Sequence, residues 1–229
     1  MDINNLTNLL NYMSLNDEYH TLTPTQINKL DNDNITKLVV IKDDNKDYTI
    51  IKKFPKYLTH LYFQDECGYN YDIGEILPDT LEYLKISWNY NKVFNKYPNS
   101  LKYLILGYSY NIQLCNLPQS LIYLKLGSSY NYPLYDLPNN LEVLILGGFY
   151  DIPINITMLP PSLKQLDLGY TYNIQLPELP YNLEYLRLSD FYMKTLPKLP
   201  DSLKYLEIGN KYIQTSINYK YKIPYLPIK

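Results

Sequence analysis

A short sequence unit returns almost every 20 residues along most of this chain, and this periodicity limits what the chain can fold into. The unit reads Pro-x-x-Leu-x-Tyr-Leu-x-Leu-Gly-x-x-Tyr-Asn and recurs from about residue 55 to residue 214. Its first leucine falls at Leu58, Leu81, Leu101, Leu121, Leu141, Leu163, Leu183 and Leu203. A unit this short cannot bury its own apolar face, so it must stack on its neighbours. The sequence therefore predicts a solenoid in which each repeat forms one turn.

The apolar residues of each unit predict a short strand. Counted from the first leucine, they stand at positions 1, 4 and 6, as in Leu101, Leu104 and Leu106. Positions 4 and 6 alternate with a residue that is often polar, which is typical of a strand with one buried face. Position 7 is glycine or serine, so small size matters more there than a positive φ angle. Prolines interrupt the remaining residues, as at 176–180, and favour an extended or 3-10 return path over an α-helix.

Position 10 is a tyrosine in seven successive units. These are Tyr90, Tyr110, Tyr130, Tyr150, Tyr172, Tyr192 and Tyr212. Stacking places them above one another, and we expect an aromatic spine with its hydroxyls at the solvent edge, because a buried phenol needs a hydrogen-bond partner. Asn or Asp follows the tyrosine in five units and is expected to cap backbone groups of the adjacent turn.

The Leu-x-x-Leu-x-Leu pattern in nearly every unit resembles leucine-rich repeats. The extension Gly-x-x-Tyr-Asn-x-x-Leu, as at 107–114, is similar to the FNIP repeat of amoebae and of their giant, mimivirus-type DNA viruses. Leu-Pro-x-Leu-Pro at 176–180 and 196–200 is also similar to the 20-residue repeats of bacterial effector proteins. The resemblance implies a β-rich, right-handed leucine-rich-repeat solenoid with one curved parallel sheet. Met193 and Ile213 stand where FNIP repeats carry Asn, so the Asn series is not expected to reach the C-terminal end.

The two ends of the chain depart from the repeat and are expected to cap it. Residues 1–34 are predicted to form an N-terminal helical cap, residues 35–214 a solenoid of about nine repeats, and residues 215–229 a C-terminal cap or blunted edge strand. The first solenoid strand is expected at 35–40.

The N-terminal cap is predicted to contain two short helices. Apolar residues at helical spacing predict the first, at Ile3, Leu6, Leu9, Leu10 and Met13. Thr23, Pro24 and Gln26 suit the N-cap, first turn and capping box of the second.

Composition argues against several classes of function. The chain has 21 basic and 23 acidic residues, a balance that does not suit nucleic-acid binding through phosphate neutralisation. It has neither a run of 18 apolar residues nor a basic-then-apolar leader, so we expect a cytoplasmic protein with no membrane partner. Cys67 and Cys115 are expected to be free thiols. His20 and His60 have no further ligand at metal spacing, and no phosphate-binding loop occurs, so neither metal nor cofactor is expected and the chain is predicted not to be an enzyme.

The sheet of a solenoid usually forms a concave binding face, and positions 2, 3 and 5 point to it. The candidate partner-binding residues in the middle of this face are Tyr83, Tyr103, Ile105, Ile122, Tyr123, Lys125, Val143 and Ile145. They are expected to form an outward apolar patch that either binds a protein or only packs between strands. Position 2 alternates in sign from Glu142 to Lys204, which predicts a cross-strand salt-bridge ladder.

The expected function is a non-catalytic protein-interaction scaffold, monomeric, that binds a protein on its concave face. If the chain is viral, the partner would be a host protein and the compartment the host cytoplasm. The alternative is a substrate-recognition adaptor of a ubiquitin ligase, because FNIP proteins often carry an F-box and residues 1–30 could hold a short F-box-like element. A carbohydrate-processing β-solenoid enzyme is disfavoured, because position 5 offers only Asp167 and Glu207, two strands apart.

Overall fold

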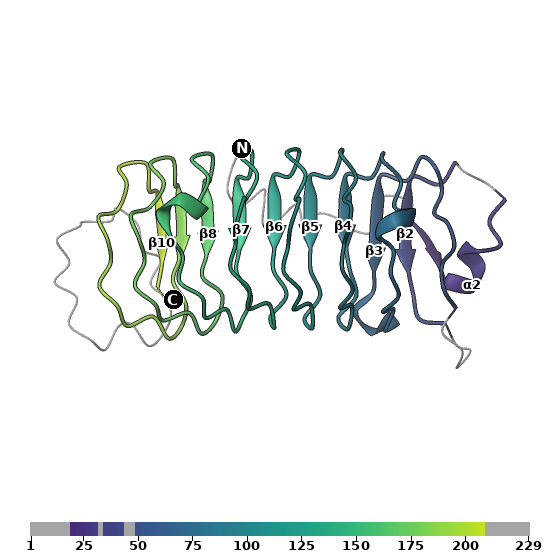
Figure 1. Ribbon diagram of the computed structural model, residues 1–229, viewed down its shortest axis with the longest axis horizontal. Coiled ribbons are helices and arrows are strands. Elements are labelled where there is room, and N and C mark those ends of the chain that lie inside the picture. The colour runs from purple at the N-terminus through teal and green to yellow at the C-terminus, as the bar shows by residue number, and fades with distance from the viewer. Residues whose placement is uncertain (1–18, 32–33, 44–48, 209–229) are drawn as a thin grey trace.

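Ten short strands pair in chain order into one parallel sheet (Figure 1). The computed structural model describes residues 19–31, 34–43 and 49–208. The strands are β1 His20–Leu22, β2 Lys37–Val40, β3 His60–Phe63, β4 Tyr83–Lys85, β5 Tyr103–Ile105, β6 Tyr123–Lys125, β7 Val143–Ile145, β8 Gln165–Asp167, β9 Tyr185–Arg187 and β10 Tyr205–Glu207. Equivalent repeat positions face each other, as Tyr103 pairs with Tyr123 and Leu104 with Leu124. This register confirms the predicted solenoid.

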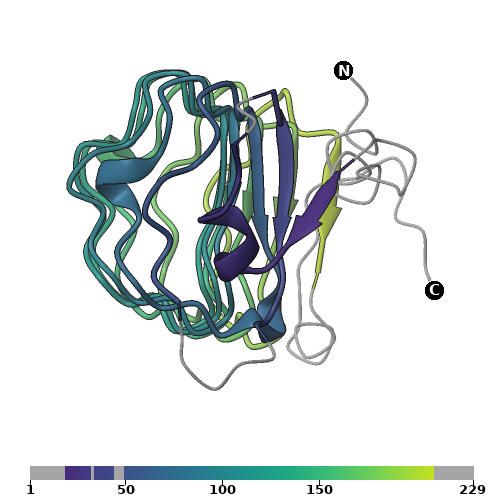
Figure 2. The same ribbon diagram turned by 90° about the vertical axis from the view of Figure 1, so that its right-hand side faces the viewer.

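The return paths lie behind the sheet and are mainly extended. Three 3-10 helices interrupt the connections, η1 Asp65–Cys67, η2 Gly74–Ile76 and η3 Ile156–Met158. The described residues contain one α-helix, α2 Pro24–Ile27, close to the N-terminal end. Seen along the solenoid, the terminal strands stand farther out than the central ones, so the sheet presents a concave face (Figure 2). No described helix is long and apolar enough to cross a bilayer.

The leucines at positions 1, 4 and 6 fill the solenoid interior. Leu101 and Leu104 are 0% exposed and Leu106 is 4% exposed. Equivalent leucines of the other repeats join them in one continuous apolar cluster. The strand face predicted from the period of two is therefore confirmed.

The tyrosine spine exists, but the prediction that its hydroxyls lie at the solvent edge is wrong. From Tyr90 to Tyr172 the ring centroids of successive repeats stand 6.3–6.5 Å apart. The rings are no more than 1% exposed, and Tyr212 lies outside the described residues. The Tyr130 hydroxyl accepts the backbone N–H of Leu114 at 3.3 Å. Leu114 lies on the return path of the preceding repeat. A backbone N–H, and not solvent, is therefore the hydrogen-bond partner of the Tyr130 hydroxyl.

The Asn side chains that follow the spine connect adjacent turns, as predicted. Asn111 donates its backbone N–H to the Asn91 side chain at 3.1 Å, and Asn131 donates to Asn111 at 3.0 Å. At the C-terminal end, Met193 donates its N–H to Asn173 at 2.8 Å. A methionine side chain has no oxygen acceptor for the next turn, so this series of side-chain caps stops at Met193.

The small residue at position 7 is required by close packing between repeats. A Cβ atom on Gly127 would lie 2.0 Å from the carbonyl oxygen of Gly107. Among the described position-7 glycines only Gly169 has a positive φ, which confirms that size matters more than φ. Ser87, which takes the glycine's place in one repeat, donates its hydroxyl to the Tyr69 carbonyl at 2.7 Å.

The N-terminal region matches the prediction only in part. Thr23 and Gln26 form the predicted capping box around α2, with Thr23 N–H donating to Gln26 Oε1 at 2.8 Å. The predicted first strand is β2, but β1 precedes it and pairs with it, His20 opposite Leu38. β1 does not show the repeat pattern, because His20 stands opposite Leu38 where the later strands carry a leucine. The first predicted helix and residues 215–229 lie outside the described residues, so the proposed domain boundaries stay predictions.

Candidate concave interface

The structure brings the predicted apolar residues together on the outward face of the sheet. Tyr83, Ile105, Tyr123 and Val143 form a buried cluster separate from the solenoid core, with Tyr62, Tyr103 and Ile145 packed against it. The register explains this contiguity, because Tyr103, Tyr123 and Val143 face one another on β5, β6 and β7. A second apolar layer therefore lies on the side of the sheet opposite the leucine core.

The residues of this layer differ in accessibility, which changes the predicted contact surface. Its buried members are Tyr83, Ile105, Tyr123 and Val143, which are 5%, 7%, 2% and 0% exposed. They were expected to face outward as an exposed patch. Large rings on adjacent strands cover one another, as the Tyr103 and Tyr123 centroids are 6.1 Å apart. Tyr103 and Ile145 are half-buried members of the layer, whereas the half-buried Ile122 and the exposed Lys125 are not part of it. We call Tyr103, Ile122, Ile145 and Lys125 the concave patch.

Burial also changes the acidity of the tyrosines in this layer. Desolvation raises the pKa of Tyr83 and of Tyr123 well above the ordinary value, and the negative charge of Asp167 adds to the effect at Tyr123. The Tyr123 hydroxyl has no hydrogen-bond partner. Both phenols therefore stay neutral at physiological pH and can act as hydrogen-bond donors.

Ion pairs between neighbouring strands neutralise most of the charge on this face. The position-2 ladder predicted from the alternating signs is present only as two separate pairs, Glu142–Lys164 at 2.7 Å and Glu184–Lys204 at 2.9 Å, with no ion pair between Lys164 and Glu184 to join them. Lys85 on β4 pairs with Asp65 at 2.9 Å. These partly exposed pairs contribute about 0–1 kcal/mol each to stability, so their main effect is on the surface potential.

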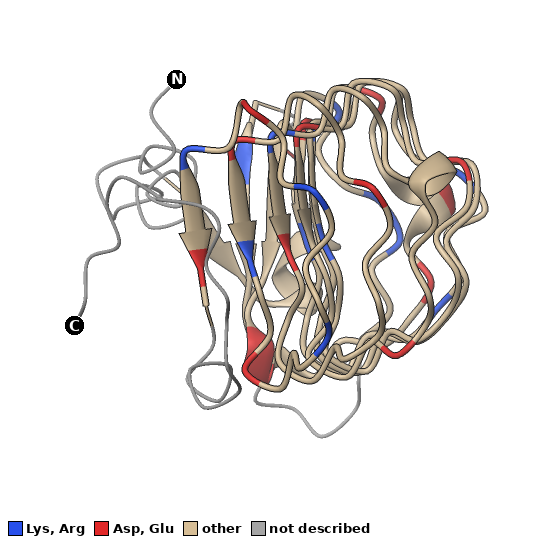
Figure 3. Ribbon diagram, turned by 90° about the vertical axis from the view of Figure 1, so that its left-hand side faces the viewer, with Lys and Arg blue, Asp and Glu red and all other residues tan. Residues whose placement is uncertain are grey.

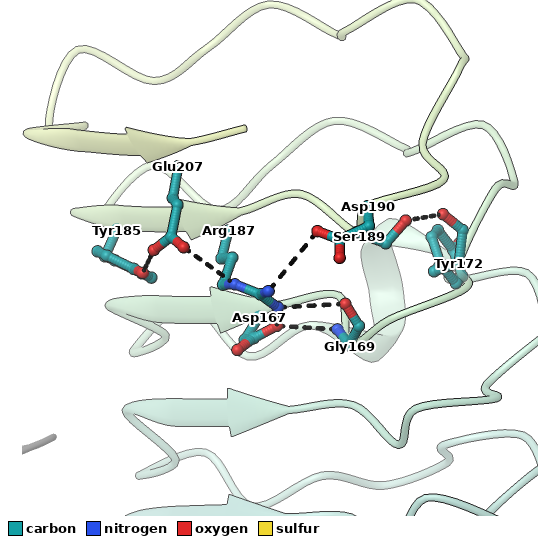
Figure 4. Close-up of polar contacts among 8 residues, drawn as sticks. All are labelled: Asp167, Gly169, Tyr172, Tyr185, Arg187, Ser189, Asp190 and Glu207. Carbon is teal, nitrogen blue, oxygen red and sulfur yellow. Dashed lines mark hydrogen bonds and ion pairs between the residues drawn. The ribbon is translucent and has the colours of Figure 1, made fainter. Parts of the chain in front are cut away.

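A denser polar group lies at the C-terminal end of the face, around Arg187 (Figure 4). Arg187 contacts Asp167 at 3.1 Å through Nη1 and Glu207 at 3.2 Å through Nε. The Tyr185 hydroxyl donates to the other oxygen of the same Glu207 carboxylate. The guanidinium thus ties together β8, β9 and β10, while Asp167 also accepts the Gly169 N–H of its own repeat at 2.8 Å.

Sequence reasoning missed a row of exposed aromatic residues where the strands end. Trp88, Tyr108, Phe149 and Tyr170 are 48%, 41%, 51% and 50% exposed. The Trp88 and Tyr108 rings lie 5.1 Å apart, and Tyr108 meets Phe149 edge-on at 6.4 Å. The aromatic residue falls at position 8 in some repeats and at position 9 in others, so alignment of the units conceals the row. An aromatic residue at either position would have been the signal.

The described residues contain no group of three His, Cys, Asp or Glu side chains able to hold a metal ion. Cys67 and Cys115 are free thiols, and burial raises the pKa of Cys67, which makes it a poor nucleophile. His60 shares a 2.9 Å hydrogen bond with Thr59 and stacks on Tyr83. Seen from the β10 end of the solenoid, positions of Lys and Arg and positions of Asp and Glu both occur along the ribbon (Figure 3).

Comparison with known proteins agrees with this architecture. The FNIP Repeat family model matches residues 69–109, 90–129 and 130–171, so the middle of the solenoid is similar to FNIP repeats. CroV588 of the giant virus CroV, described as a novel circular LRR protein structure, is 25% identical with a TM-score of 0.53 over 77% of this chain and 34% of its own. YopM from Yersinia enterocolitica is 25% identical over 76% of this chain and 36% of its own, with a TM-score of 0.49. The chain thus spans about a third of the length of either protein. No curated protein matches it.

Proposed function

We propose that this solenoid of FNIP-like repeats is a non-catalytic scaffold that binds a protein partner on the concave face of its sheet. Leucine-rich-repeat folds generally serve as protein-interaction scaffolds. The observation that carries the proposal is the second apolar layer, which lies outside the leucine core and places tyrosine and isoleucine side chains on the binding side of the sheet. Outward apolar clusters of this kind are common at interaction sites, and tyrosine is a frequent anchor residue there.

The accessible concave patch is the part of this face that a partner would touch. Tyr103, Ile122 and Ile145 are half-buried, so their ring or methyl groups remain available while their backbones are fixed by the sheet. Rigid side chains lose little conformational entropy on binding, which favours affinity. The buried members beneath would hold the patch in shape and contribute indirectly.

The test is a partner pull-down with a double variant of the accessible residues. Tyr103→Ala with Ile145→Ala should abolish recovery of a partner from an amoebal lysate while the circular dichroism spectrum stays unchanged. Tyr123→Ala is less suitable, because Tyr123 is 2% exposed and its loss would disturb packing. The control is Tyr181→Ala, which removes a tyrosine that is 71% exposed on the return path. Equal partner recovery by wild type and double variant would contradict the proposal.

The ubiquitin-ligase adaptor stays a prediction. Residues 1–18 lie outside the described residues, and the described part of 1–30 contains the four-residue α2 and the strand β1. Recovery of ligase subunits in the same pull-down would support the adaptor. We also propose that the chain is a cytoplasmic monomer, which size-exclusion chromatography with light scattering and imaging of a tagged chain would test.

A further inference from the structure

Three strands carry a tyrosine at position 3 followed by a cation at position 5. These pairs are Tyr83/Lys85 on β4, Tyr123/Lys125 on β6 and Tyr185/Arg187 on β9. Side chains two residues apart on a strand point to the same face, so each pair projects from the concave side. The repeat thus presents one polar combination three times along the sheet.

On two of these strands the position-5 cation is bound to a carboxylate of the same chain. On β9 the Tyr185 hydroxyl and the Arg187 Nε both donate to Glu207, one to each oxygen (Figure 4). On β4 the Lys85 ammonium lies 2.9 Å from Asp65 Oδ1 and also donates to the Tyr62 hydroxyl. The tyrosine of the pair shares the carboxylate on β9 alone, so the feature common to both strands is a cation that holds an acidic side chain.

Within the described residues Lys125 makes no ion pair, because Asp167, the acidic residue whose charge reaches Tyr123, lies two strands away and is held by Arg187. Lys125 is exposed and is flanked across the sheet by Ile105 and Ile145. The Tyr123 hydroxyl is buried without a hydrogen-bond partner. The other charged side chains at positions 2 and 5 of β4–β10 are all ion-paired, as Glu82–Lys102, Glu142–Lys164, Glu184–Lys204, Lys85–Asp65 and Arg187 with Asp167 and Glu207.

We propose that Lys125, with Tyr123 beside it, receives an Asp or Glu carboxylate of the protein partner, while apolar residues on either side of that carboxylate pack on Tyr103, Ile122 and Ile145. The proposal rests on the proposed function and names the chemistry of its partner. A charge-assisted hydrogen bond to Lys125 in apolar surroundings gives specificity. Lys125 is exposed whereas the Tyr123 hydroxyl is buried, so Lys125 is the donor.

A single cation among neutralised charges selects a carboxylate of a protein over a polyanion. Nucleic acids and acidic membranes are bound by many cations acting together. On this face the neighbouring cations Lys102 and Lys164 are already held by Glu82 and Glu142. The surroundings of Lys125 are apolar, which suits a peptide segment with one acidic residue between apolar ones.

Short synthetic peptides and the full-length chain test this directly. The peptides carry a central Glu, Gln or Lys between Leu, Ile and Phe residues, and binding is measured by fluorescence polarisation at low ionic strength. The wild type should bind the Glu peptide about tenfold more tightly than the Gln peptide. Lys125→Met should abolish that preference, and Lys125→Glu should reverse it in favour of the Lys peptide. Tyr123→Phe, which keeps the ring, should leave the preference for the Glu peptide unchanged, because the Tyr123 hydroxyl is buried.

Lys198→Glu provides the matched control, because Lys198 is an exposed lysine on the return path. It should retain the wild-type preference for the Glu peptide. An unchanged preference in Lys125→Met overturns the inference but leaves the proposed function intact if Tyr103→Ala with Ile145→Ala still abolishes peptide binding. If no peptide binds and the double variant also retains its lysate partners, both the inference and the proposed function are wrong.

Discussion

Each tyrosine of the spine fills the same place in its repeat, yet the spine hydroxyls differ in their hydrogen bonds. Tyr130 and Tyr150 are both 0% exposed and stack on each other with centroids 6.3 Å apart. The Tyr130 hydroxyl accepts the Leu114 N–H at 3.3 Å. The Tyr150 hydroxyl has no partner in hydrogen-bond geometry, although the Leu134 backbone lies near it. Removing the hydroxyl from each of these two equivalent tyrosines therefore separates the contribution of the hydroxyl to stability from that of the ring.

The prediction is that Tyr130→Phe costs more stability than Tyr150→Phe. Removing the Tyr130 hydroxyl leaves the buried Leu114 N–H without an acceptor, which should lower the free energy of unfolding by about 1–3 kcal/mol. Tyr150→Phe removes a buried hydroxyl that has no partner, so its effect should be close to zero or slightly stabilising. Urea unfolding followed by circular dichroism measures both. Equal losses in the two variants would show that the hydroxyl of Tyr130 is not a structural acceptor.

At the scale of the element, the turn after each strand depends on the closeness of neighbouring repeats. Gly127→Ala places a methyl group 2.0 Å from the Gly107 carbonyl oxygen and forces backbone atoms apart. We expect a loss of about 3 kcal/mol, at the upper end of overpacking costs. Gly148→Ala is the matched control, because its Cβ would lie 3.5 Å from the Ser128 side chain, an ordinary contact. Thermal unfolding should show a large shift for Gly127→Ala alone, and similar midpoints would refute the close-packing argument.

The repeat predicted the elements well because equivalent positions repeat the same local environment. The leucine face, the Asn caps and the Thr23 capping box follow from side-chain type and spacing within one repeat, and the structure confirms all three. The direction of the tyrosine hydroxyls depends instead on a backbone donor in the preceding repeat, as with Leu114. The repeat period alone does not reveal the course of the return path, which brings the Leu114 N–H to the Tyr130 hydroxyl.

The sequence predicted which residues of the candidate interface lie side by side, but not how exposed each of them is. The alternation of the strand correctly placed Tyr103, Tyr123 and Val143 side by side. It did not indicate that Tyr123 and Val143 would be almost fully buried, because burial depends on how large neighbours pack across strands. Sequence spacing does not show which acidic residue each lysine reaches. That Lys125 makes no ion pair within the described residues is therefore evident only from the ion pairs of the folded chain.

For the whole molecule, stability depends on many similar contacts between neighbours rather than on one central core. The leucines and the tyrosine spine both run from repeat to repeat along the solenoid. In a solenoid, each repeat is stabilised chiefly by the interfaces on its two sides. A perturbation that acts on the same position of every repeat should therefore act on the molecule as a unit.

High pH is such a perturbation, because burial shifts many phenols in the same direction. Desolvation raises the pKa of Tyr69 to about 12 and raises those of Tyr90, Tyr110, Tyr130, Tyr150 and Tyr172 above the ordinary value. A raised pKa in the folded state means that the unfolded chain loses its protons first. The stabilisation is therefore complete below the ordinary pKa of about 10 and is lost as the pH rises through the folded-state values.

The expected result is one steep alkaline transition. Above pH 10 each buried phenol that ionises on unfolding lowers the free energy of unfolding by up to about 1.4 kcal/mol per pH unit, and the contributions of the spine add. Absorbance of phenolate near 295 nm and far-ultraviolet circular dichroism, recorded on the same samples, measure this. Absorbance from the buried phenols of the spine should appear together with the loss of dichroism. Complete ionisation near pH 10 with the fold intact would mean that the spine is open to solvent.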